Sequence, residues 1–163
     1  MSKSNMCFDK KREKYWNEDY MLYWKERVSE ANNLHSKPST MIKGDANTTT
    51  DKTYINAIEL LNITKTDIVV EIGCGFGRSL PILCKLSYHV TALDISTAMV
   101  EVASKTVKEK NISFCVSSSE NTPLDDNKYD IAVCFASFDA MCQTKALIEI
   151  NRMCKKGAKV LLT

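Results

Sequence analysis

Histidine is scarce in this chain of 163 residues, and the cysteines form no metal-binding pairs. The two histidines, His35 and His89, lie far apart, and no C-x-x-C pair occurs among the seven cysteines. Zinc sites need such residues in close groups. We therefore predict no metal site and interpret the cysteines as reduced core residues. They are Cys7, Cys74, Cys84, Cys115, Cys134, Cys142 and Cys154.

Long apolar runs and an excess of charge of either sign are also missing. The 22 basic and 20 acidic side chains give a formal net charge of +2, which predicts no bulk electrostatic affinity for nucleic acid or membranes. No apolar stretch reaches the roughly 20 residues that a membrane-spanning helix needs, and residues 1–16 contain no apolar signal-peptide core. We therefore predict a soluble, cytoplasmic protein that binds neither nucleic acid nor membrane.

Only five glycines occur, and three of them, Gly73, Gly75 and Gly77, alternate within one short stretch. Apolar residues precede them and a helical pattern follows, which predicts a buried strand, a tight turn and a helix. Open α/β sheets bind nucleotides at such turns. A phosphate-binding P-loop is excluded because it needs wider glycine spacing and a following lysine. The dinucleotide fingerprint is excluded because Arg78 stands where it needs glycine or alanine.

Two acidic residues stand at the ends of the first two predicted strands. The carboxylate of Glu71, just before the glycines, suits a ligand that carries an ammonium or sulfonium charge. Asp94, at the end of the second strand, is placed to accept hydrogen bonds from both hydroxyls of a ribose. The alternative is that Asp94 caps the next helix, a task that Ser96 can perform instead.

A third motif lies between the third and fourth predicted strands. It contains E-N-x-P followed by Y-D, at Glu120, Asn121, Pro123, Tyr129 and Asp130. Together with the acidic residue and G-x-G-x-G, and with the later aspartate, this order resembles the class I S-adenosylmethionine-dependent methyltransferases from about residue 51 onward. The resemblance implies an α/β Rossmann-like fold with a mostly parallel, five-stranded sheet of order 3-2-1-4-5. We expect strands at 67–72, 89–93, 111–116, 129–135 and 158–163, and helices at 52–62, 77–86, 96–109 and 142–155.

The resemblance also implies S-adenosyl-L-methionine as the cofactor and a set of residues that bind it. The set comprises Glu71, Gly73, Cys74, Gly75, Gly77, Asp94, Ile95, Met99, Ser118, Ser119, Glu120 and Phe135. Family members often carry aspartate, which contacts the adenine amino group, at the position of Ser118. A serine there implies weaker or altered cofactor affinity.

The chain before the cofactor-binding domain of residues 51–163 is predicted to form an arm, an aromatic helix and a loop over residues 1–50. The aromatic side of the helix packs on the main domain, acts as a lid over a substrate pocket, or does both. In the second case Tyr20 and Trp24 line the substrate pocket together with Phe138. In the loop that follows, His35 is either a base near this pocket or a surface residue.

The pocket for the methyl acceptor is predicted to be lined by residues 135–141, which follow the fourth strand. Asp139 is the one ionisable residue there, and it either acts as a catalytic base or begins the next helix. The sequence F-A-S-F-D-A-M lacks the motif of family members that methylate DNA bases or certain glutamines, which disfavours those acceptors, and a small-molecule acceptor is the default expectation. Displacement of the methyl group from the sulfonium is the predicted reaction. The alternatives are a cofactor-binding protein or truncated pseudoenzyme without turnover, and a nicotinamide oxidoreductase.

The sequence departs from the family pattern after the fifth predicted strand. Family members usually continue with a helix and an antiparallel hairpin, whereas this sequence stops at Thr163. A bare fifth strand promotes association. We therefore expect either a fragment of a longer protein or an edge that is covered by the N-terminal region or by a second copy in a homodimer.

Overall fold

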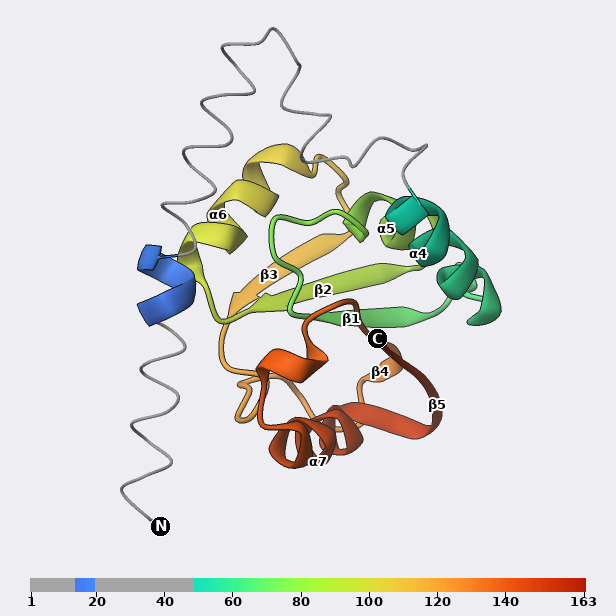
Figure 1. The fold of residues 1–163 in the computed structure, drawn as a ribbon. Coiled ribbons are helices and arrows are strands. Elements are labelled where there is room, and N and C mark those ends of the chain that lie inside the picture. The colour runs from blue at the N-terminus through green and yellow to red at the C-terminus, as the bar shows by residue number, and fades with distance from the viewer. Residues whose placement is uncertain (1–13, 20–48) are drawn as a thin grey trace, which may run out of the picture.

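The structure, a computed structural model, describes residues 14–19 and 49–163 (Figure 1). The first range contains the short π-helix η1 (Tyr15–Asp19). Most of the predicted aromatic helix lies outside the described residues, as do Tyr20, Trp24 and His35. The predictions for these side chains, and the division of the chain at residue 50, therefore stay predictions.

Five strands form the centre of the molecule, and all neighbouring strands run parallel (Figure 1). They are β1 (Ile68–Ile72), β2 (His89–Asp94), β3 (Ile112–Val116), β4 (Tyr129–Cys134) and β5 (Cys154–Leu162). Their order is β3-β2-β1-β4-β5, which confirms the predicted order and fold class. The order reverses between β1 and β4, and the carboxyl ends of the strands at such a reversal are where open parallel sheets bind ligands.

Helices cover both faces of the sheet because both faces carry apolar side chains. One face packs against α4 (Thr49–Leu60), α5 (Leu80–Leu86) and α6 (Thr97–Thr106), and the other packs against α7 (Gln143–Met153) (Figure 1). Successive strand residues point to opposite faces. Val69 accordingly joins the first core and Val70 the second. Burial on both sides explains why β1 and β4 are nearly continuous apolar runs.

Two predicted helix starts are wrong. α5 begins at Leu80 instead of residue 77, because Gly77 has a φ of +88° that is incompatible with a helix and Pro81 occupies the first helical turn. α4 begins at Thr49 instead of residue 52. The predicted cap of α6 is present, since the Ser96 hydroxyl accepts a hydrogen bond from the backbone N–H of Met99 at 3.2 Å.

The start of β5 is a further correction. The strand begins at Cys154, directly after α7, whereas residue 158 was predicted. Tyr129 pairs with Cys154 while Ile131 pairs with Lys159, so the intervening residues of β5 bulge out of register. Gly157 lies in this bulge with a φ of +84°, a backbone conformation that favours glycine.

The sheet ends at β5 on one side. β5 forms one edge of the described sheet, with β4 as its neighbour. The homodimer expected across this edge stays a prediction.

Among the described residues, no helix combines the length and apolarity that crossing a membrane would take.

Arg152 of α7 ties the segment between β3 and β4 to that helix. Its guanidinium donates hydrogen bonds to the carbonyl oxygens of Leu124 at 2.8 Å and Thr122 at 3.2 Å. Its hydrogen bond to Glu149 lowers the pKa of Glu149 to about 2. These contacts fix the course of the E-N-x-P segment, and thereby position residues 117–119 immediately before it.

Candidate functional site

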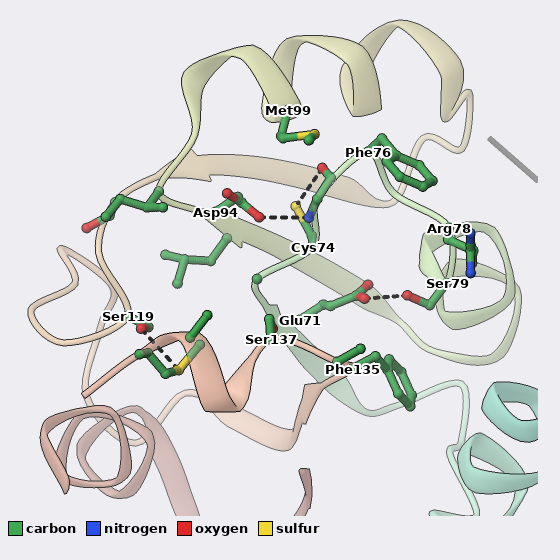
Figure 2. A pocket seen from close by; sticks show the side chains of 18 of the residues that line it. Glu71, Cys74, Phe76, Arg78, Ser79, Asp94, Met99, Ser119, Phe135 and Ser137 are labelled. Atoms are coloured by element: carbon green, nitrogen blue, oxygen red, sulfur yellow. Dashed lines mark hydrogen bonds between the residues drawn. The ribbon is translucent and has the colours of Figure 1, made fainter. Parts of the chain in front are cut away.

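A cavity of about 290 Å³ opens at the carboxyl ends of β1, β2 and β4, where the strand order reverses (Figure 2). Side chains from the glycine turn, the end of β2, the segment after β3 and the segment after β4 converge on it. The lining comprises Tyr54, Glu71, Gly73, Cys74, Gly75, Phe76, Arg78, Ser79, Leu93, Asp94, Ile95, Met99, Ser117, Ser118, Ser119, Phe135, Ala136, Ser137, Ala140 and Met141.

Gly73 and Gly75 hold the glycine turn in a shape that other residues rarely adopt, with φ of +70° and +52°. The backbone N–H of Gly73 donates to the carbonyl oxygen of Leu93 at 2.8 Å, which ties the turn to the end of β2. A Cβ at Gly73 would lie 2.2 Å from the hydroxyl of Ser137, whereas a Cβ at Gly75 would meet nothing within 4 Å. Gly73 thus allows close packing, and Gly75 leaves the backbone open toward the cavity.

Gly77 has a different role from the other two glycines of the turn. It is buried and is not among the described residues that line the cavity. A Cβ there would lie 2.9 Å from Cδ1 of Leu80 and 3.1 Å from Cγ2 of Val107. The third glycine of the motif therefore allows the turn to pack against the start of α5 and the end of α6.

The carboxylate of Asp94 lies beside the glycine turn and faces the cavity (Figure 2). One oxygen accepts a hydrogen bond from the backbone N–H of Gly75 at 2.7 Å, and the other accepts from the N–H of Ser96 at 2.9 Å. Burial raises the pKa of Asp94, and these hydrogen bonds oppose that rise. Ser96, not Asp94, provides the side-chain cap of α6. Each carboxylate oxygen keeps a lone pair for a further donor.

Glu71 brings a second carboxyl group to the cavity, from the end of β1. Its side chain is buried, with 2% of the residue exposed, and the hydroxyl of Ser79 donates a hydrogen bond to Oε1 (Figure 2). Oε2 has no hydrogen-bond partner among the described residues. Burial raises the pKa of Glu71 to about 8, and the nearby Asp94 carboxylate contributes to the rise. The carboxyl group of Glu71 therefore holds its proton more strongly than an exposed glutamate does.

The thiol of Cys74 lines the same cavity but is unreactive as a nucleophile. Burial raises its pKa well above the ordinary value, and the charges of Asp94 and Glu71 raise it further. A thiol attacks only as the thiolate. Cys74 therefore shapes the cavity and is not a nucleophile at neutral pH.

Three serines after β3 line the cavity, Ser117, Ser118 and Ser119, while the acidic residue that follows them does not. The hydroxyl of Ser118 accepts a hydrogen bond from the N–H of Glu120 at 3.2 Å, and the hydroxyl of Ser119 contacts the sulfur of Met141 at 3.3 Å. Glu120 is not among the lining residues, because its carboxylate accepts from the N–H of Cys142 at 2.6 Å. It joins the loop to the start of α7.

The segment after β4 supplies part of the lining, but not all the residues predicted for it. Phe135 lines the cavity and packs on Tyr54 of α4, with ring centroids 4.7 Å apart. Phe138 instead packs against the core on the α7 side. Asp139 is exposed in the short 3-10 helix η2 (Phe138–Ala140) and is not among the described lining residues. Its position gives no geometric support for a catalytic base.

The sequence did not single out Tyr54 or Phe76 as site residues, and Arg78 served only to exclude the dinucleotide fingerprint. All three line the cavity. The guanidinium of Arg78 lies 5.6 Å from the centre of the Phe76 ring. An arginine directly after the glycine turn could have been recognised as a cavity residue from its place in the motif. Tyr54 carries no such local signal.

The domain that carries this cavity is similar to known proteins in sequence and in structure. The family model for a methyltransferase domain matches residues 70–162, more than half of the chain. This chain belongs to the methyltransferase-domain family. An uncharacterized methyltransferase of Bacillus subtilis, YdaC, is 31% identical over 109 residues, which cover 65% of this chain and 60% of YdaC.

Solved structures share the fold of this methyltransferase domain. YcgJ of Bacillus subtilis matches with a TM-score of 0.66 at 24% identity, and the match covers 69% of this chain and 50% of YcgJ. A SAM-dependent methyltransferase from Aquifex aeolicus matches with a TM-score of 0.59 at 25% identity, over 78% of this chain and 66% of that protein. These similarities confirm the class I methyltransferase fold. The chain spans between half and two thirds of the length of these three proteins.

Proposed function

We propose that the protein transfers a methyl group from S-adenosyl-L-methionine to a small-molecule acceptor. The observation that carries the proposal is the Asp94 carboxylate, held by the N–H of Gly75 at the mouth of a cavity beside an open glycine turn. A carboxylate in this place suits the two hydroxyls of a ribose. The membership of the methyltransferase-domain family supports the reaction class.

The donor groups around the cavity fit the parts of this cofactor. Asp94 has lone pairs left for the ribose, and the apolar side chains of Ile95 and Met99 offer a surface for the adenine ring. The open backbone at Gly75 lets the methionine moiety approach the turn closely, and the carboxyl group of Glu71 suits the positive charge of the sulfonium. Ser118 offers the adenine a hydroxyl in place of a carboxylate.

The residues of the chain contribute mainly binding and orientation. When bound, the cofactor supplies a methyl group that is activated by its sulfonium. Phe135, Tyr54 and Arg78 border the cavity beyond the glycine turn, where they can orient an acceptor and exclude water.

Titration of the purified chain with S-adenosylmethionine, S-adenosylhomocysteine and NAD tests the cofactor. We expect the first two to bind and NAD not to bind. A ligand at a hundred times its dissociation constant should stabilise the fold by about 2.7 kcal/mol, which thermal unfolding resolves. A folded protein that responds to none of them would refute the proposal. Transfer of labelled methyl groups to a metabolite extract then separates an enzyme from a cofactor-binding protein without turnover.

Two glycine substitutions separate binding from folding at the turn. Gly75→Ala adds a Cβ in open space at a φ of +52°, so we expect a stability loss of about 1 kcal/mol and at least tenfold weaker cofactor binding. Gly77→Ala places its Cβ 2.9 Å from Leu80, and we expect a loss of about 3 kcal/mol with little direct effect on affinity. Urea unfolding and calorimetry of the two variants measure both effects. Equal affinity losses in the folded variants would contradict these roles.

A further inference from the structure

Glu71 places a carboxyl group inside the protein with little to stabilise its charge. The residue is 2% exposed, Ser79 donates its hydroxyl to Oε1, and Oε2 has no hydrogen-bond partner among the described residues. A carboxylate that is removed from water needs several donors or a cation to stay ionised. One hydroxyl donor does not meet that need, so the neutral acid is favoured.

The groups that surround Glu71 on every side are acidic or neutral at physiological pH, apart from one arginine. Asp94 of β2 contributes a second carboxyl group, and the neighbouring cysteines are thiols with raised pKa. Burial and the other acidic groups thus keep the proton on Glu71. The titratable and charged groups that face Glu71 or share its cavity are Asp94 of β2, Cys74 of the glycine turn, Cys84 of α5, Cys134 of β4, Tyr54 of α4 and Arg78 before α5.

We propose that Glu71 distinguishes the cofactor from its product by charge: it holds a proton in the free cavity and releases that proton to solvent when S-adenosylmethionine binds. This inference rests on the proposed function. The sulfonium brings a positive charge to the cavity that Glu71 lines, and an opposite charge at short range favours the carboxylate. The product is a thioether without that charge, so Glu71 takes a proton back after methyl transfer.

Because of this proton exchange, the dissociation constants of the two ligands should depend differently on pH. Because Glu71 ionises only as the pH approaches about 8 in the free protein, cofactor binding at lower pH requires proton release. The dissociation constant of S-adenosylmethionine should then fall about tenfold per pH unit between about pH 6 and about pH 7, and level off near pH 8. The dissociation constant of S-adenosylhomocysteine should change far less. Both ligands share the amino acid moiety, so the difference between them isolates the sulfonium.

Isothermal titration calorimetry in buffers of different ionisation enthalpy counts the protons released. Near pH 7 we expect about 0.9 proton per S-adenosylmethionine bound and much less for S-adenosylhomocysteine. Glu71→Gln should remove the difference between the ligands, because a glutamine cannot release a proton. Glu101→Gln is the matched control, since Glu101 is an exposed carboxylate on α6 with 63% of its side chain accessible, and this variant should keep the wild-type proton count.

The outcomes separate this inference from the proposed function. Equal proton counts for the two ligands in the wild-type protein would overturn the role of Glu71, while the binding itself would still support the proposed function. An unchanged difference in folded Glu71→Gln would overturn it as well. If neither ligand binds the folded wild-type protein, both the proposed function and this inference fail. The wild-type proton count and its pH dependence decide the matter even if the variant does not fold.

Discussion

Replacing Asp94 with alanine is expected to weaken S-adenosylmethionine binding by a hundredfold or more. The carboxylate would hold two ribose hydroxyls, and hydrogen bonds to a charged group contribute about 1.5 to 3 kcal/mol each. Loss of about 3 kcal/mol corresponds to a factor of about 150 in the dissociation constant. The substitution also removes the acceptor for the N–H of Gly75, which loosens the glycine turn. Calorimetric titration of the folded variant measures the effect.

Ser96→Ala is the control for the loss of structure around Asp94. Ser96 caps α6 through the N–H of Met99 and is not among the described residues that line the cavity. Removing the cap should lower the free energy of unfolding by about 1 kcal/mol and leave the affinity nearly unchanged. If both variants lose the same affinity, Asp94 acts only through the backbone around it and the ribose contact would be refuted.

Replacing Glu71 with glutamine is expected to stabilise the free protein at neutral and higher pH, although it should impair cofactor recognition. The folded pKa of Glu71 is about 8, above the ordinary value of 4.5. The folded protein therefore binds more protons than the unfolded chain, and its stability falls as the pH rises from about 4.5 to about 8. Glutamine avoids this loss. The variant should match the wild type near pH 4 and exceed its free energy of unfolding by about 3 kcal/mol near pH 7.

Urea unfolding of both proteins across this pH range measures the difference. The free energies of unfolding should diverge steadily with rising pH, and Glu101→Gln should run parallel to the wild type. Curves for Glu71→Gln that stay parallel to the wild type would mean that Glu71 is ionised in the folded protein. A gain in stability together with a loss of binding would mean that Glu71 serves cofactor recognition and lowers the free energy of unfolding.

Local patterns in the sequence predicted a parallel sheet and the position of the site. The alternation of apolar strands and helical segments predicted the parallel sheet, because right-handed crossovers join such strands. Its order, β3-β2-β1-β4-β5, was implied by the resemblance to class I methyltransferases and is the order that the structure shows. The spacing between the glycine turn and Asp94 predicted that the two would meet, and the 2.7 Å hydrogen bond from Gly75 shows that they do. Both features depend on residues whose place follows from the strand that carries them.

Tertiary contacts decided the roles of individual residues in the site. Gly75 and Gly77 look alike in the sequence, yet only the packing of Leu80 and Val107 reveals that Gly77 faces a helix and Gly75 the cavity. Tyr54 reaches the site through its contact with Phe135, more than seventy residues along the chain. The pKa of Glu71 likewise follows from how completely neighbouring elements bury it. Periodicity and spacing specify the local geometry of a segment, whereas which side chains meet and how much water remains depend on the folded packing of distant segments.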